Sequence, residues 1–157
     1  MIPFTLSYTP PKDESDILLL GLSAEALIST RELRAKNIFG LSTCHITSKY
    51  GSVSEDNKKF DHLAIMPCFE AGILATIEDI EKYHLTGRRY SPVQLGNEWS
   101  GDLTMAYGRN LASIMKVDPV NTLNFYETAE ILLRAMAIME NGDPARNITE
   151  GYFGQFV

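Results

Sequence analysis

The chain has 157 residues, enough for one domain with a buried core. Its 45% of hydrophobic and 22% of charged residues are typical of a soluble globular protein. A formal net charge of −6 argues against nucleic acid or an anionic membrane surface as the main partner. No apolar run approaches the ~20 residues of a membrane span. Two cysteines make no disulfide framework, so we expect a reducing, cytoplasmic compartment.

The first third of the chain predicts one strand, one helix and an ambiguous stretch. Apolar and small or polar residues alternate over residues 2–8, which indicates a half-buried strand that Pro10-Pro11 ends. Ser15 is expected to cap a helix that continues to residue 22. The following residues, 23–36, fit a helix that Ser23 caps anew, and residues 26–33 also fit a strand. A further strand is expected over residues 39–50, and a polar loop over 51–59.

Residues 60–85 predict the central element of the fold. They indicate a short extended run, a stop at Pro67 and a helix of about five turns. From Cys68 to Ala75 this helix is apolar on nearly every side, so its first half is expected to be buried. Residues 76–84 are amphipathic, and we expect this second half to emerge toward water.

Beyond the central helix the patterns favour strands. Residues 88–95, 102–107 and 111–117 read as extended segments, with a turn-rich break at 96–101. Residues 127–140 fit both a helix and a strand. Asn141-Gly142 is a strong hairpin dipeptide, and aromatic and small residues alternate after it over residues 148–157. We therefore predict a closing hairpin, with a helix and a terminal tail as the alternative.

Three passages in this part of the chain resemble the hotdog fold, in which an antiparallel sheet wraps around one long helix. Residues 64–67 (Ala-Ile-Met-Pro) are similar to the entry into the central helix of the superfamily's dehydratases. Residues 89–96 are similar to its R-x-x-P-V-x-x-G segment, and residues 139–153 to its closing hairpin. The resemblance covers residues 60–157. It implies an α+β fold, a homodimer, no cofactor, and a substrate that is an acyl thioester of coenzyme A or acyl-carrier protein.

The resemblance also implies candidate catalytic residues. At the two places where the dehydratases carry a histidine and an acid, this chain has Lys59 and Ile73, while His62 and Glu70 lie nearby but out of register. In the thioesterases an acid on the central helix activates water or attacks the thioester, and Glu70 is the candidate because an apolar turn increases the basicity of a carboxylate. The alternative is an acid held at the helix N-terminus by its dipole.

Four further residues are expected to bind substrate. Cys68 and Gly72 would line a tunnel beside the helix, and Arg88-Arg89 would contact the phosphate of a coenzyme A or carrier-protein arm. Cys68 could also be a thiolate nucleophile in the first helical turn, or simply a small buried thiol. Arg88-Arg89 could equally be a solvated helix exit. The His and Cys spacings give no zinc signature, so no metal is expected.

Two functions follow as hypotheses. The first is a hotdog-like protein that binds or acts on an acyl thioester, as a thioesterase or a dehydratase, and whether it is an enzyme stays open. The second is a non-enzymatic α+β interaction protein, such as an immunity or assembly factor. Its docking surface would be the acidic face of the central helix, formed by Glu78, Asp79 and Glu81.

Overall fold

The computed structural model describes residues 8–54 and 62–157. The strand predicted over residues 2–8, apart from Tyr8, and much of the loop predicted over 51–59 therefore lie outside the described residues. The structure is a mixture of helix and sheet, and 57% of the described residues are helical. The helices are α1 (Asp13–Leu20), α2 (Ala24–Leu27), α3 (Arg31–Arg34), α4 (His45–Lys49), α5 (Phe69–Tyr83), α6 (Pro92–Ser100), α7 (Ala106–Met115) and α8 (Phe125–Asn141), followed by the 3₁₀ helices η1 (Asp143–Asn147) and η2 (Phe153–Phe156).

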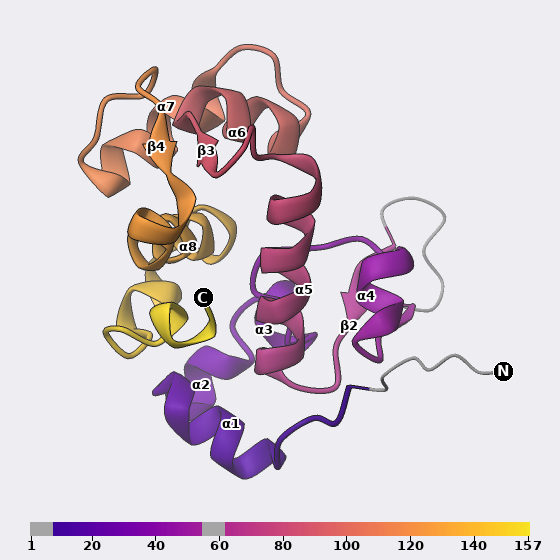
Figure 1. Ribbon diagram of the computed structural model, residues 1–157. Coiled ribbons are helices and arrows are strands. Elements are labelled where there is room, and N and C mark those ends of the chain that lie inside the picture. Colours follow the sequence, from indigo (N-terminus) through magenta and orange to yellow (C-terminus); the bar gives the residue numbers. More distant parts are fainter. Residues whose placement is uncertain (1–7, 55–61) are drawn as a thin grey trace, which may run out of the picture.

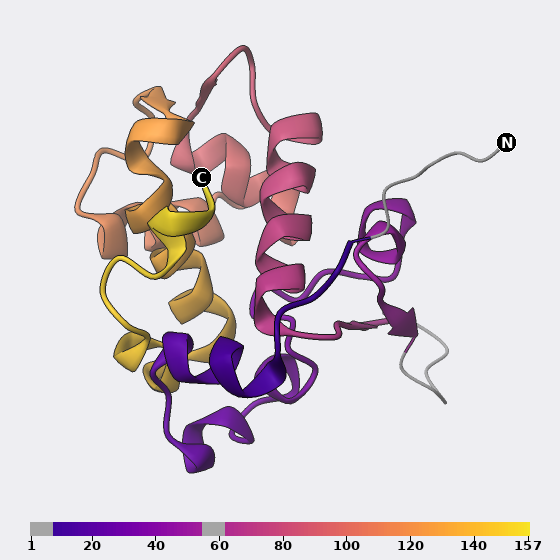
Figure 2. The same cartoon turned by 60° about the horizontal axis from the view of Figure 1, so that its bottom comes forward.

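Helix α5 runs through the middle of the molecule, as Figure 1 shows. α1, α2 and α3 lie near its N-terminal end, and α6 lies near its C-terminal end. α8 and the 3₁₀ helices lie on one side of α5, whereas α4 and the short strands beside it lie on the other (Figures 1 and 2). The ambiguous stretch 23–36 is helical, since it forms α2 and α3, and Ser23 caps α2 by accepting the N–H of Ala26.

The prediction of a buried central helix is confirmed. α5 packs between two apolar clusters, which explains why its first half is apolar on nearly every side. Phe69 and Ile73 belong to the main core, which α5 shares with α8, while Ala71 and Ala75 belong to a smaller cluster that includes Ile46 of α4. The second half is amphipathic as expected.

The strands predicted over residues 39–50, 102–107 and 111–117 are wrong, and of the extended segment predicted over 88–95 only Arg89–Tyr90 forms a strand. Residues 45–49 form α4, where the buried Thr47 side chain accepts the N–H of Cys44 and so satisfies a donor at the helix N-terminus. Residues 106–115 form α7, and residues 92–100 form α6, with Pro92 in the first turn, where its missing N–H costs nothing. Gly101 ends α6 in the left-handed region at φ 71°.

The closing hairpin is also wrong, and the alternative of a helix followed by a tail is correct. α8 continues to Asn141, and the chain then forms η1 and η2 rather than a second strand. At the other end of α8 the Asn124 side chain accepts the N–H groups of Tyr126 and Glu127 at 2.9 and 3.1 Å, a regular N-cap. Asn141-Gly142 is thus a helix terminus and not a hairpin turn.

Strands within the described residues are short and occur in two antiparallel pairs. β1 (Val53–Ser54) pairs with β2 (Ala64–Ile65), and β3 (Arg89–Tyr90) pairs with β4 (Leu123–Asn124). Neither pair wraps around α5, so the helix is enclosed by other helices where the resemblance implied a sheet.

The C-terminal segment returns to the first helix. The backbone N–H and the hydroxyl of Thr149 both donate to the carbonyl oxygen of Leu20, at 3.0 and 3.2 Å. Gly21 follows at φ 80°, and a Cβ there would collide with the Thr149 hydroxyl. The end of α1 is therefore bonded to the segment between η1 and η2.

Candidate functional site

The first turn of α5 brings Cys68 and Glu70 together with two residues of the N-terminal segment. The Asp16 carboxylate accepts the backbone N–H groups of Phe69 and Glu70, at 2.6 and 3.1 Å, while Tyr8 donates its hydroxyl to Glu70 at 2.5 Å. Asp16 is 3% exposed, and burial raises the pKa of its carboxyl. Asp16 therefore caps α5 from α1, a role that its position in the sequence did not indicate.

Cys68 is a buried thiol. Burial raises the pKa of Cys68, although N–H and O–H donors nearby act in the opposite direction. The thiolate nucleophile considered from the sequence is therefore not favoured. Close to this cluster, the Tyr152 hydroxyl is buried and has no hydrogen-bond partner in the described part of the chain.

Gly72 permits a close contact between backbones. A Cβ on Gly72 would lie 2.7 Å from the carbonyl oxygen of Lys36 and 3.4 Å from the Met66 side chain. The space beside Gly72 is thus filled by protein, which accounts for glycine at this position without a substrate tunnel.

The other predicted site residues lie elsewhere. His62 is exposed, its carbonyl oxygen accepts the N–H of Thr43, and no hydrogen bond or ion pair joins it to Glu70 in the described residues. Arg88 and Arg89 follow the opposite end of α5, which at fifteen residues is about 22 Å long. Arg88 lies over the Tyr126 ring at 4.2 Å. Glu70 and the arginine pair therefore do not converge on one site.

Each carboxylate of the expected acidic docking surface binds another residue of the chain. Glu78 accepts hydrogen bonds from Lys49 and Tyr50 at 2.8 and 2.9 Å. Asp79 pairs with His84, and Glu81 accepts the hydroxyl of Tyr126. Glu78 and Glu81 thus attach α5 to α4 with its following residue and to α8, whereas Asp79 bonds the residue that follows α5.

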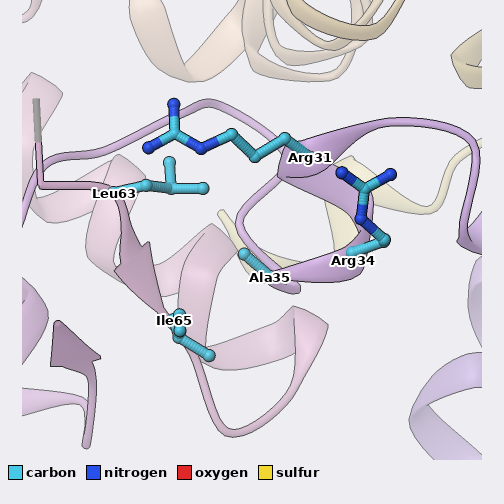
Figure 3. Close-up of a pocket in the computed structure, with 5 residues that line it drawn as sticks. All are labelled: Arg31, Arg34, Ala35, Leu63 and Ile65. Carbon is cyan, nitrogen blue, oxygen red and sulfur yellow. The ribbon is translucent and has the colours of Figure 1, made fainter. Parts of the chain in front are cut away.

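A hollow of about 150 Å³ lies between α3 and the segment that contains β2 (Figure 3). Arg31 and Arg34, one helical turn apart, contribute two guanidinium groups, and Ala35, Leu63 and Ile65 contribute apolar surface. In Figure 3 the Arg31 side chain extends over Leu63. Two guanidinium groups and an apolar floor therefore line this hollow, in a chain whose net charge is −6.

Hydrogen bonds fix both walls of this hollow. Thr30 caps α3 through the N–H of Leu33 and donates its hydroxyl to Asn141 of α8 at 2.7 Å. On the other side, the N–H of Met66 donates to the carbonyl oxygen of Ala35 at 2.9 Å, and the fully buried Asn37 side chain donates to the carbonyl of Ala64 at 2.8 Å. The two arginines are thus held on a preorganised wall.

A second, more apolar hollow of about 210 Å³ adjoins the first and shares Arg34 with it. The Arg34 guanidinium donates to the carbonyl oxygen of Ile28 at 3.0 Å, which holds it at the rim. Lys36, also at the rim, is paired with Asp13. The apolar lining comes from α1, α2, α3, the residue after α2 and the first residue of α5: Ile17, Leu27, Ile28, Leu33 and Phe69.

Sequence reasoning missed this arginine pair because residues 23–36 had no settled secondary structure. The i, i+3 spacing of Arg31 and Arg34 places both on one helix face, but only once the stretch is known to be helical. Within residues 8–54 and 62–157, no three His, Cys, Asp or Glu side chains gather as a group that could hold a metal ion. No described helix has the length and apolar character needed to cross a bilayer.

Comparison with known proteins assigns no family to the chain. No family model matches it. A search of curated proteins likewise returned no match.

Proposed function

We propose that the protein binds an acyl thioester, with the acyl chain in the apolar hollow and the anionic carrier arm at Arg31 and Arg34. The observation that supports this proposal is the position of Arg34, which lines both the apolar hollow and the hollow between α3 and β2. An acyl thioester of coenzyme A has the matching chemistry, since an alkyl chain is joined to an arm that carries phosphates. Guanidinium groups are well suited to phosphate oxygens, which they can bind through two parallel hydrogen bonds.

The size of the apolar hollow limits the acyl group. An apolar cavity of about 150 Å³ holds a benzene molecule, so about 210 Å³ accommodates a short alkyl chain. Each methylene group that enters contributes about 0.8 kcal/mol, roughly a fourfold gain in affinity. We therefore expect affinity to rise with chain length up to a short or medium acyl group and then to level off.

Isothermal titration calorimetry with a series of acyl-CoA molecules, and with coenzyme A alone, tests the proposal. We expect acyl-CoA to bind more tightly than coenzyme A by the chain-length factor given above. Equal binding of coenzyme A and all acyl-CoA molecules would mean that only the phosphates are recognised. The absence of any binding would refute the proposal.

Three variants separate the two parts of the site. Arg34→Gln is expected to weaken binding of acyl-CoA about tenfold, because a charge-assisted contact is lost. Ile28→Ser, at a side chain that is 65% exposed, should reduce the effect of chain length and leave the binding of coenzyme A unchanged. Arg146→Gln, at an exposed ion pair with Asp143, is the matched control and should bind like the wild type.

Hydrolysis or dehydration is a separate proposal that concerns Glu70. Its support is that Phe69, the preceding residue, lines the apolar hollow, so the half-buried Glu70 lies at the same end of α5. Release of coenzyme A from the same acyl-CoA series measures thioesterase activity, and hydration of an enoyl-CoA measures the dehydratase reaction in reverse. Loss of turnover in Glu70→Gln with binding retained would assign Glu70 as the base. Binding without turnover in the wild type would leave a carrier or sensor of acyl thioesters.

The homodimer implied by the resemblance and the cytoplasmic location belong to the same proposal. Cys44 and Cys68 are both free thiols, which supports a reducing compartment. Analytical ultracentrifugation of the chain measures the oligomeric state directly.

A further inference from the structure

Another hollow lies far from the acyl site, beside β3 at the beginning of α6. It has a volume of about 360 Å³, within the range of small-molecule sites. Arg89 of β3 lines it, together with the hydroxyl-bearing residues Thr86, Ser91 and Thr122 and the amide of Gln94. The chemistry of this lining is thus cationic and rich in hydroxyl groups.

The backbone of Arg89 is fixed by hydrogen bonds, while its side chain has no partner in the part of the chain that the structure describes. Thr86 and Arg89 exchange two backbone hydrogen bonds, at 2.9 and 3.2 Å, around the turn that contains Gly87 at φ 67°. Across residues 8–54 and 62–157, no carboxylate, carbonyl oxygen or aromatic ring binds the Arg89 guanidinium. The neighbouring Arg88, by contrast, lies over the Tyr126 ring. Arg89 is an exposed cation that lines the hollow and has no counter-ion in the described residues, so it can bind an anionic ligand.

The backbone N–H groups at the beginning of α6 are already used. The N–H of Val93 donates to the carbonyl oxygen of Pro119, that of Gln94 donates to the Ser91 hydroxyl oxygen, and Pro92 has none. Recognition in this hollow therefore depends on side chains and not on the helix terminus. The Ser91 hydroxyl accepts from Gln94, which leaves its own proton to donate to a ligand.

The side-chain amide of Gln94 adds a hydrogen-bond acceptor to this lining. Its nitrogen donates to Glu98 at 3.1 Å, which leaves the amide oxygen as an acceptor. The lining therefore offers a guanidinium and hydroxyl donors for oxyanions, and an amide oxygen and hydroxyl acceptors for ligand hydroxyl groups. We infer that the hollow binds the phosphate monoester of a small polyhydroxylated molecule, of the class of sugar phosphates, with Arg89 on the phosphate.

Calorimetric titration at low ionic strength with glucose 6-phosphate, glucose and inorganic phosphate tests this inference on the whole chain. We expect saturable binding of glucose 6-phosphate, weaker binding of phosphate, and none of glucose up to about 10 mM. The absence of saturable binding of glucose 6-phosphate in this range would refute the inference. Tighter binding of phosphate than of the ester would refute the polyol part.

Variants locate the ligand. Arg89→Gln is expected to lower the affinity about tenfold, and Thr122→Val, which removes one exposed hydroxyl group, about threefold. Arg34→Gln and Arg146→Gln serve as controls for the acyl site and for the loss of one exposed positive charge, and should leave this affinity unchanged. An equal loss in Arg89→Gln and Arg146→Gln would show a general charge effect and overturn the assignment. Because Arg34→Gln tests only the acyl site, failure of one proposal is distinguishable from failure of the other.

Discussion

Asp16 is the residue on which the central helix depends most directly. Cys68, the residue before α5, gives its first turn no side-chain cap, and the Asp16 carboxylate from α1 takes that role. The free N–H groups and the helix dipole both favour a negative charge at this place. A side chain 53 residues away in the sequence therefore does what a neighbouring Ser or Asp does in most helices.

Asp16→Ala is expected to destabilise the protein by about 1–3 kcal/mol, because two buried N–H groups lose their acceptor. Asp16→Asn, which keeps one carbonyl oxygen, should lie between this variant and the wild type. Urea unfolding measures both, with the exposed Glu14→Ala of the same helix as the control. A change of less than about 0.5 kcal/mol for Asp16→Ala would contradict the capping role.

For single residues, the sequence predicted properties that depend on local chemistry, such as burial. A buried thiol was one of the three interpretations of Cys68, whereas Gly72 was expected to line a tunnel and instead permits a close approach of backbones. The partners of both residues could not be predicted. Asp16 and Lys36 reach α5 only through tertiary packing, which no pattern within a helix records.

Among the contacts between elements, the one around His84 contains a titratable imidazole with two carboxylate partners. The His84 ring donates toward Glu98 of α6 at 2.7 Å and toward Asp79 of α5 at 3.3 Å, and it meets the Trp99 ring edge-on. The bond to Asp79, which outweighs burial, and then the bond to Glu98 raise the pKa of His84. His84, Asp79 and Glu98 line a hollow that Ser42 also lines, and Ser42 adds a hydroxyl group but no charge.

The direction of the His84 pKa shift determines how the free energy of unfolding depends on pH. Because the folded-state pKa of His84 is raised, its contribution to stability is complete below the ordinary value of about 6.5 and is lost as the pH rises through the folded value. We expect His84→Gln to be about 1 kcal/mol less stable than the wild type at pH 6, and the difference to shrink by pH 9.

Urea unfolding of both proteins at several pH values measures this difference. His45→Gln is the matched control, since His45 is exposed and has no carboxylate partner in the described residues. A difference between wild type and His84→Gln that grew toward alkaline pH would show that the imidazolium does not stabilise the α5–α6 contact.

For the molecule as a whole, helix exceeds strand, and far-UV circular dichroism checks this directly. We expect the double minimum of a helical protein with a small contribution from β1–β4. A spectrum dominated by strand would support the sheet that the resemblance implies and would contradict α7 and α8 together. The measurement needs no variant, and thermal unfolding followed at the same wavelengths serves as a control for a folded sample.

The sequence predicted the centre of this fold better than its periphery. A helix that is apolar on nearly every side and follows Pro67 has few alternatives to a buried position, and that prediction is correct. Residues 127–140 contain small and apolar residues that fit both the helix period and the strand period, so the choice depended on the turn signal that follows them. Asn141-Gly142 indicated a hairpin, whereas the Asn124 cap and the packing of α8 against the main core determined a helix. The arginine pair of the candidate site depended on the same kind of decision.

The bonds between Thr149 and Leu20 have a consequence for synthesis of the chain on the ribosome. The two residues are 129 positions apart. At a translation rate of 5–20 residues per second, roughly 6 to 26 s separate the synthesis of Leu20 from that of Thr149. During that interval the apolar side chains of the N-terminal segment remain accessible to chaperones and proteases. Nascent chains released before residue 149 should therefore be degraded much faster than chains that include it.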